Sequence, residues 1–472
     1  MKKTKWLAAC IAAAFVLALV IGCSSGDDDE PDLPGVVEKD GWLMYGSTVM
    51  QYRGSEEKVT TPAGATIIGS YAFEGTGVKE VTIGEGVTVI ESRAFSGCKS
   101  LASVTIPESV KSIEGEAFYG CTSLESVTIP GSVKSIGGSA FYECTSLASV
   151  TIGDGVESIW EYAFSGCTSL AEVTIGGGVK SIGESAFSGT SLESVEIPGS
   201  VESIGESAFE NCTSLAEVTI GGGVKSIGEY AFYECTSLAS VTIGDGVESI
   251  GESAFENCTS LASVEIPGSV KSIESSAFSG CENFAVTYGG TLAQWCQMDN
   301  DSSLVEYATS IKLSDGNDLR SLTTLKNLSG VTKIGAYAFD GCRSLESVEI
   351  PGSVESIGGS AFYQCTSLAE VTIGGGVKSI GDWVFYGCTS LASVTIPGSV
   401  KSIGESAFLL CTSLESVEIP GSVESIGADA FSSCTRLTDV KYGGTKEQWE
   451  AIAGIANSGL EDKEIHYESE AK

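Results

Sequence analysis

A phenylalanine preceded by alanine or valine recurs every 23 residues through most of this 472-residue chain. A fixed period of that length is typical of a solenoid, in which each repeat buries its apolar face only against its neighbours. The period therefore predicts a long stack with a continuous core and an extended binding surface, and it disfavours a catalytic pocket. The recurrences are Phe95, Phe118, Phe141, Phe164, Phe187, Phe209, Phe232, Phe255, Phe278, Phe339, Phe362, Phe385, Phe408 and Phe431.

The repeat from Leu124 to Cys144 indicates how one unit is built. Ser126–Ile129 alternates polar and β-branched residues, which predicts a short strand with Val127 and Ile129 facing inward. Gly137–Cys144 is too short for a regular helix, and we expect a helical turn there. The predicted fold class is α/β, with one short strand and one helical turn in each unit of about 23 residues.

Most of the 16 cysteines occupy a single repeat position. No Cys-x-x-Cys pair occurs, so a zinc site has almost no support. Disulfides between adjacent units are conceivable, but the unit around Phe187 has Thr190 in place of cysteine. We favour buried thiols that pack as small apolar groups. The thirteen are Cys98, Cys121, Cys144, Cys167, Cys212, Cys235, Cys258, Cys281, Cys342, Cys365, Cys388, Cys411 and Cys434.

The charge balance is 26 basic against 62 acidic residues, a net charge of −36. Such a field repels nucleic acid and anionic lipid headgroups, so both are poor candidate partners. Lysine and glutamate also alternate at one repeat position, as at Lys134, Glu157 and Lys180. We expect these side chains to pair between neighbouring units and to support register and solubility.

The first residues suggest export. Lysines precede an apolar stretch from Trp6 to Ile21, which is short for a membrane-spanning helix, so we predict a signal peptide over residues 1–22. Val20–Cys23 resembles a bacterial lipobox, which implies a lipid on Cys23; ordinary secretory cleavage is the alternative. Residues 23–37 are predicted to be an acidic tether, which serves either as a surface-export signal or as a plain spacer.

The period breaks once, and the break divides the array. We predict an N-terminal cap and first array over residues 38–285, a break segment over 286–330, a second array over 331–439 and a C-terminal cap over 440–472. Val286–Trp295 and Val440–Trp449 are close copies that contain Tyr-Gly-Gly-Thr. We interpret each as a strand and a short helix that lays a tryptophan over the open end of the stack; sugar binding is the less favoured alternative.

Two groups of residues are candidates for binding. Trp160 and Trp383 stand on the turn edge, at or beside positions that glycine usually holds, and they either are exposed anchors or pack over the turn. The outward positions of the strands hold serine, threonine and glutamate, a composition that favours many weak contacts or a merely solvated face. The candidate glutamates are Glu172, Glu196, Glu217, Glu265, Glu349, Glu370 and Glu418.

The sequence offers little from which an active site could be assembled. His466 is the single histidine, and the plentiful serines stand at repeated structural positions without a matching base. We therefore predict no catalytic residue, no metal site and no cofactor.

The run Leu-x-x-Val-x-Ile-Pro-x-x-Val-x-x-Ile-Gly-x-x-Ala-Phe-x-x-Cys, as in Leu391–Cys411, closely resembles the BspA-like bacterial leucine-rich repeat. The resemblance implies a curved leucine-rich-repeat solenoid on the surface of host-associated bacteria. It also implies binding to host extracellular-matrix or bacterial surface proteins. With the lipid anchor, we expect an adhesin at the cell surface, on the outer membrane. A surface coat or spacer without a specific ligand is the alternative.

Overall fold

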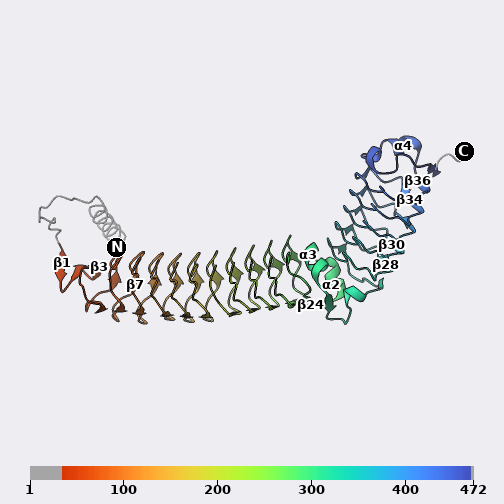
Figure 1. The fold of residues 1–472 in the computed structure, drawn as a ribbon. Coiled ribbons are helices and arrows are strands. Elements are labelled where there is room, and N and C mark those ends of the chain that lie inside the picture. Colours follow the sequence, from red (N-terminus) through yellow and green to blue (C-terminus); the bar gives the residue numbers. More distant parts are fainter. Residues whose placement is uncertain (1–34, 469–472) are drawn as a thin grey trace. The chain divides into compact units, whose positions relative to one another are not determined.

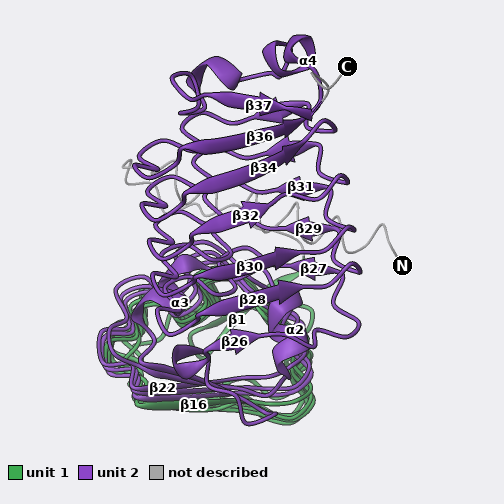
Figure 2. Cartoon of the chain, turned by 90° about the vertical axis from the view of Figure 1, so that its right-hand side faces the viewer, with its two compact units in different colours: residues 1–213 green, residues 214–472 purple. Residues whose placement is uncertain are grey.

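The computed structural model describes residues 35–468 and divides into two compact units on either side of Thr213 and Ser214. Figure 2 distinguishes the two units by colour. Within each unit the chain winds through successive short strands, which Figure 1 shows as rungs following one another along the sequence. The leucine-rich-repeat solenoid predicted from the sequence is confirmed.

Unit 1 begins with an antiparallel hairpin, and parallel rungs follow it. The hairpin strands are β1 (Val36–Lys39), β2 (Trp42–Tyr45) and β3 (Thr48–Tyr52). The first strands of the repeats are β4 (Lys58–Thr60), β6 (Glu80–Thr82), β8 (Ser103–Thr105), β10 (Ser126–Ile129), β12 (Ser149–Ile152), β14 (Glu172–Thr174) and β16 (Ser194–Ile197). The second strands are β5 (Ile67–Ile68), β7 (Val89–Ile90), β9 (Ser112–Ile113), β11 (Ser135–Ile136), β13 (Ser158–Ile159), β15 (Ser181–Ile182) and β17 (Ser203–Ile204).

Unit 2 contains two runs of rungs with a connecting segment between them. The first run has β18 (Glu217–Ile220), β20 (Ser240–Ile243), β22 (Ser263–Ile266), β24 (Ala285–Tyr288) and β25 (Ser310–Leu313), with short strands β19 (Ser226–Ile227), β21 (Ser249–Ile250) and β23 (Ser272–Ile273). The connecting segment lies between β24 and β26: α2 (Leu292–Gln297) and α3 (Ser302–Tyr307) precede β25, and the 3₁₀ turn η1 (Leu319–Ser321) follows it.

The second run of unit 2 repeats the same pattern. Its first strands are β26 (Thr324–Leu325), β28 (Ser347–Ile350), β30 (Glu370–Ile373), β32 (Ser393–Thr395), β34 (Ser416–Pro420), β36 (Asp439–Gly443) and β37 (Ile465–Tyr467). Its short strands are β27 (Lys333–Ile334), β29 (Ser356–Ile357), β31 (Ser379–Ile380), β33 (Ser402–Ile403) and β35 (Ser425–Ile426). The chain forms α4 (Lys446–Glu450) and η2 (Ile455–Asn457) before β37.

The strand register places like residues side by side. Val127 of β10 pairs in parallel with Val150 of β12, and Ile129 pairs with Ile152. Along β10 the burial alternates between exposed and buried, because successive side chains of a strand point to opposite faces. Val127 and Ile129 therefore face the core, as predicted. Most repeats also have a second, two-residue strand, such as β11, which the sequence pattern does not predict.

The segment predicted as a helical turn is a chain of tight turns. In the unit of Phe141, three N–H···O=C bonds link residues three apart: Ala140 to Gly137, Tyr142 to Ser139, and Cys144 to Phe141. The intervening N–H groups of Ser139, Phe141 and Glu143 instead donate to carbonyls of the next unit, at 2.8, 2.8 and 3.0 Å. This alternation requires left-handed backbone at Ser139 and Glu143, where φ is 55° at both, so no continuous helix forms.

The recurring phenylalanines form buried stacks within each unit. Phe118 lies 5.0 Å from Phe141 between ring centroids, and Phe141 lies 5.2 Å from Phe164, with nearly parallel rings. Trp42 and Tyr52 of the N-terminal hairpin continue the first stack, since Tyr52 stacks on Phe73 at 5.6 Å. These side chains exclude water from the centre of each repeat.

The cysteines are free and buried throughout residues 35–468. A typical thiol, that of Cys144, donates to the carbonyl oxygen of Phe118 at 3.2 Å. Burial raises the pKa of the Cys434 thiol to about 12, so this thiol stays protonated at neutral pH. Thr190 replaces the missing cysteine with a hydroxyl that donates to the carbonyl of Phe187 at 2.9 Å. The prediction of packed thiols is confirmed for the described residues.

Opposite charges pair between neighbouring units, as predicted. Glu157 lies 3.3 Å from Lys134 and 3.5 Å from Lys180. The hydrogen bond from Lys134 and the positive charges of both lysines hold the pKa of Glu157 below its usual value. These exposed pairs favour the native register while contributing little to stability.

The connecting segment of unit 2 joins its two runs through main-chain bonds. Asp299 donates its N–H to Lys271 at 3.1 Å and accepts from Ile273 at 2.9 Å, while Gly335 donates to Cys296 at 2.7 Å. Trp295 is fully buried and donates its indole N–H to the carbonyl of Ala338 at 2.7 Å. Trp295 is thus covered by the following repeat and does not close an open end, which corrects the interpretation of this copy as a lid.

We expect Phe141→Ala to lower the free energy of unfolding by about 3–5 kcal/mol, because it removes a ring held between two others and leaves a cavity. Urea denaturation followed by circular dichroism measures the change. Tyr142→Ala is the matched control: Tyr142 is half-buried beside Tyr119 and should cost far less. An unchanged midpoint for Phe141→Ala would contradict the stacked core.

Candidate binding surfaces

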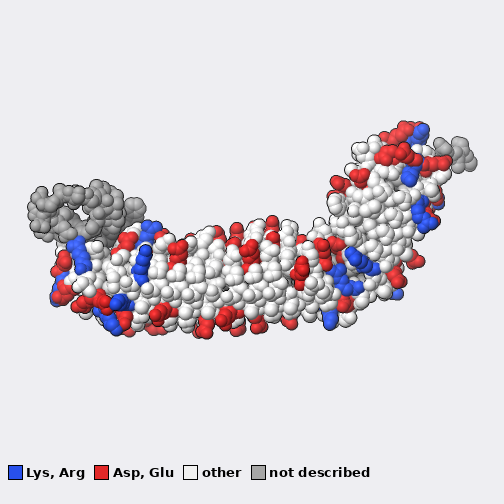
Figure 3. All heavy atoms as spheres, in the orientation of Figure 1, with Lys and Arg blue, Asp and Glu red and all other residues white. Residues whose placement is uncertain are grey.

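The candidate glutamates all lie exposed on the outward face of the first strands, as predicted. Their cross-strand partners are small hydroxyl residues or a lysine. Glu172 pairs with Ser149, and Glu418 pairs with Thr395 on one side and Lys441 on the other, where the ammonium lies 3.4 Å from the carboxylate. This face therefore offers hydroxyls and carboxylates, without a concentrated apolar anchor at these positions. Figure 3 shows acidic side chains along the visible face, with fewer basic ones.

Trp160 in unit 1 lies on the turn edge with 52% of its surface exposed. Its neighbour Tyr162 is also exposed and donates its hydroxyl to Glu184 at 2.6 Å, and this hydrogen bond raises the pKa of Tyr162. The predicted anchor at Trp160 is thus available to solvent as a single indole.

Trp383 in unit 2 belongs to a larger group, which we call the aromatic cluster: Tyr363, Trp383 and Tyr386. The rings of Tyr363 and Tyr386 stack at 4.6 Å, and Trp383 lies 6.4 Å from the first and 6.0 Å from the second. Trp383 is 42% exposed, and Leu410 on the same turn edge is 38% exposed. Two consecutive repeats therefore support one exposed indole, that of Trp383, beside two stacked, half-buried tyrosine rings.

Tyr363 is not among the binding residues predicted from the sequence. A signal was present, because Tyr363 and Tyr386 are 23 residues apart and follow the repeated phenylalanine directly. Residues at one repeat position stack on each other, so two tyrosines in register predict a stacked pair. Trp383 is two residues before the phenylalanine of its own repeat and reaches both rings from there.

Asp340 occupies the same repeat position one unit before Tyr363. Burial, reinforced by the charge of Glu306 and opposed by Arg320, raises the pKa of its carboxyl to about 7. Arg320 donates its guanidinium to the main-chain carbonyl of Ala308, at 3.0 and 3.1 Å, and so fastens the connecting segment. Asp340 is therefore a carboxyl that titrates near neutral pH at the edge of the second run.

The remaining sequence predictions concern His466 and Cys23. His466 is exposed on β37, with its ring nitrogen 3.8 Å from a carboxylate oxygen of Asp439. Among residues 35–468, no group of three or more histidine, cysteine or acidic side chains is arranged to hold a metal ion. Over the same span, no helix is both long and apolar enough to cross a bilayer. Cys23, the predicted signal peptide and most of the acidic tether lie outside the described residues.

Strand rungs, buried phenylalanine stacks and an exposed strand face together define a leucine-rich-repeat scaffold. The family described as BspA type Leucine rich repeat region matches residues 49–171, 180–292 and 320–453, with six copies. The chain belongs to this family, as the resemblance of its repeat motif predicted.

Solved structures of bacterial leucine-rich-repeat proteins are similar to this chain. One from Bacteroides ovatus is 25% identical, covers 93% of this chain and 100% of its own, and has a TM-score of 0.47. A leucine rich cell surface protein from Faecalibacterium prausnitzii is 29% identical, covers 90% and 99% of the two chains, and has a TM-score of 0.40. The T. pallidum Leucine Rich Repeat protein is 33% identical over 33% of this chain and 76% of its own, with a TM-score of 0.31. No curated protein matches the chain.

We expect Asp340→Asn to change the pH dependence of stability. The folded carboxyl holds its proton to about pH 7, whereas an unfolded aspartate ionises near 3.8. Between these values the unfolded state binds fewer protons, so this group's contribution to stability falls as pH rises. The asparagine variant lacks that loss. Its stability relative to the wild type should therefore rise from pH 4 to pH 7 and then level off.

Thermal unfolding at a series of pH values measures this difference. Glu349→Gln, an exposed carboxylate on the outward strand face, serves as the matched control. Parallel stability curves for Asp340→Asn and the wild type across this pH range would contradict the assignment.

Proposed function

We propose that this protein is a lipid-anchored cell-surface protein of the leucine-rich-repeat class that binds other proteins and mediates adhesion. The observation that carries the proposal is the aromatic cluster of Tyr363, Trp383 and Tyr386, in which Trp383 is exposed and the two tyrosines are half-buried. Trp and Tyr are the residues that most often dominate the energy of protein interfaces. A mere coat protein would not need a tryptophan 42% exposed on a base of two stacked tyrosines.

The outward strand face adds a second, weaker contribution. It repeats hydroxyl and carboxylate groups at regular spacing on parallel strands, and the whole chain carries a net charge of −36. A basic or repetitive partner surface matches this charge and this repetition, because many weak contacts add through multivalency. Host extracellular-matrix proteins and bacterial surface proteins, the partners expected from the family resemblance, are the candidates for such a surface.

The surface location rests on the beginning of the sequence and on the family resemblance. Lysines, an apolar stretch and Cys23 follow the order of a lipoprotein signal. Two acyl chains on one cysteine give stable membrane attachment. The proposed site of attachment is the outer membrane, with the repeats outside the cell.

We expect Trp383→Gly to reduce partner binding at least tenfold without unfolding the protein. Trp383 has a φ of 63°, a left-handed conformation that glycine adopts without the cost that other residues carry, so removal of the ring does not strain the turn. A tenfold loss corresponds to about 1.4 kcal/mol, well within the range of an interface anchor. Adhesion of cells displaying each variant to immobilised matrix proteins measures the effect.

Two further variants sharpen this experiment. Trp160→Ala tests the isolated indole of unit 1, and Lys401→Ala removes an exposed side chain that lies outside the cluster and pairs with Glu424. Lys401→Ala should bind as the wild type does. If neither tryptophan variant loses adhesion, the coat hypothesis replaces the adhesin.

We expect Cys23→Ala to release the protein from membranes, because the lipid would have no sulfur to attach to. Fractionation of cells followed by immunoblotting measures the distribution, and metabolic labelling with a fatty-acid analogue detects the lipid directly. Cys10→Ala, within the predicted signal peptide, is the matched control and should remain membrane-bound. Retention of Cys23→Ala in the membrane fraction would refute the anchor.

A further inference from the structure

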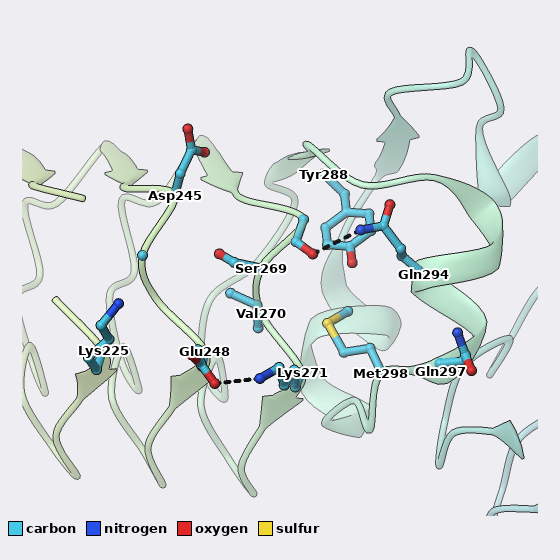
Figure 4. A pocket seen from close by; sticks show the side chains of 12 residues that line it. Lys225, Asp245, Glu248, Ser269, Val270, Lys271, Tyr288, Gln294, Gln297 and Met298 are labelled. Atoms are coloured by element: carbon cyan, nitrogen blue, oxygen red, sulfur yellow. Dashed lines mark hydrogen bonds and ion pairs between the residues drawn. The ribbon is translucent and has the colours of Figure 1, made fainter. Parts of the chain in front are cut away.

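A pocket of about 460 Å³ lies in unit 2 where α2 stands beside the turns that follow β20 and β22. This volume is within the range of about 300–1,000 Å³ that small-molecule sites occupy. Figure 4 shows Lys225, Asp245 and Glu248 on the repeat side, and Gln294 and Gln297 of α2 on the other. None of these groups belongs to the aromatic cluster or to the candidate glutamates.

Tyr288 forms one wall of the pocket and carries an unsatisfied polar group. Its side chain is 1% exposed, and its hydroxyl has no hydrogen-bond partner among residues 35–468. In Figure 4 the ring lies between Ser269 and Gln294, with the hydroxyl directed towards Met298. A buried hydroxyl without a partner destabilises the protein, since it has lost its bond to water. A ligand hydroxyl in the pocket would supply the missing bond after a small movement of the wall.

A tyrosine ring also packs over a glycine two residues later in the N-terminal hairpin, and there the tyrosine hydroxyl has a hydrogen-bond partner. The Tyr52 ring packs over Gly54 in the same way as the Tyr288 ring packs over Gly290. A Cβ atom added at Gly54 or at Gly290 would lie only 2.5 Å from the ring of the corresponding tyrosine. The Tyr52 hydroxyl accepts the N–H of Glu56 at 3.2 Å. The Tyr-x-Gly geometry therefore does not by itself leave the tyrosine hydroxyl without a partner.

The polar groups around the pocket point to an uncharged ligand. Its charged side chains are two lysines and two carboxylates, Lys225, Asp245, Glu248 and Lys271, which balance. Glu248 already pairs with Lys271. The charge of Lys225 helps to lower the pKa of Glu248, but neither Lys225 nor Asp245 makes a side-chain hydrogen bond or ion pair within the described residues, so one donor group and one acceptor group remain available. Neither an anion nor a cation is selected by such a set.

The apolar part of the lining completes the chemistry. Val270, Met298 and the Tyr288 ring present carbon surface between the polar groups. The main-chain groups at the free edge of β23 are already hydrogen-bonded, because Asp299 bonds to the main chain of Lys271 and Ile273. An extended peptide therefore cannot bind there as an additional strand. A pyranose ring has hydroxyls that both donate and accept, together with apolar C–H faces, and it matches all of these features.

We propose that this pocket binds a neutral saccharide of one or two rings, with the Tyr288 hydroxyl, Asp245 and Lys225 bonding to its hydroxyl groups. The site is independent of the proposed protein-binding surface around Trp383, and it gives the same scaffold a second kind of ligand. Gln294 holds the wall in place, since its amide donates to the carbonyl of Gly268 at 3.2 Å and accepts from the N–H of Thr291 at 2.9 Å.

The test is isothermal titration calorimetry of the full chain with glucose, galactose, mannose, N-acetylglucosamine, lactose and maltose. Glucuronate and glycine serve as the anionic and zwitterionic probes. We expect saturable binding of at least one neutral sugar. Tyr288→Phe should weaken it about tenfold, because a single hydrogen-bonding group is lost. Thermal unfolding of this variant should occur at the same or a higher temperature, since the orphaned hydroxyl is gone.

Two controls make the result decisive. Tyr442→Phe changes the equivalent tyrosine of the C-terminal copy and should leave sugar binding unchanged. The two tyrosines are equivalent because Tyr442 contacts Trp449 at 5.1 Å, as Tyr288 contacts Trp295 at 5.3 Å. Asp245→Asn should weaken binding from the repeat side. Absence of binding by every neutral sugar, binding by glucuronate or glycine alone, or equal affinity of Tyr288→Phe and the wild type would each overturn the proposal.

Discussion

Main-chain hydrogen bonding between consecutive repeats is the interaction on which the structure depends. Each repeat donates to its neighbour along two strands and again through alternate N–H groups of the turn segment, as at Ser139, Phe141 and Glu143. A repeat alone would leave these groups without partners, and a buried, unpaired main-chain group is costly. The phenylalanine stacks and the thiols fill the space that this hydrogen-bonded frame encloses. Within each unit, stability therefore belongs to the stack and not to any single repeat.

The same frame leaves certain side chains free to vary. Left-handed positions two residues before each phenylalanine hold serine in some repeats, tyrosine in others, and tryptophan at Trp383. Because the main chain at these positions is fixed by its bonds along the stack, the side chain contributes little to the fold and can be chosen for other reasons. A left-handed residue other than glycine costs about 1 kcal/mol, and serine, tyrosine and tryptophan bear that cost alike at this position. What distinguishes Trp383 is its exposed ring, which supports a role in recognition.

The sequence predicted the parts of the fold that repeat in side-chain pattern. Alternation identified Ser126–Ile129 as a strand, and the fixed period identified the stacks of phenylalanine and cysteine. The second strand was missed because Ser135–Ile136 is too short to show alternation. The left-handed turns were missed because Ser139 and Glu143 are not residues that typically announce positive φ. The aromatic cluster was found only in part: the 23-residue spacing of Tyr363 and Tyr386 predicts their stacking, but the contact of Trp383 with Tyr363 depends on packing between different repeat positions.

Trp295 and Tyr288 show why two copies of the Tyr-Gly-Gly-Thr motif can have different surroundings in the fold. The two Tyr-Gly-Gly-Thr copies predict the same strand and helix, and both form them, with the same capping box at Thr291 and Thr445. What covers each copy depends on the chain that follows: Trp295 bonds to a repeat 43 residues later, at Ala338. The repeat turns beside α2 also enclose Tyr288 in a polar pocket while leaving its hydroxyl unpaired. The Tyr-Gly-Gly-Thr motif determines the local strand and helix, but residues distant in the sequence determine which polar groups surround them. Where those residues leave a buried group such as the Tyr288 hydroxyl without a partner, a ligand can supply the missing hydrogen bond.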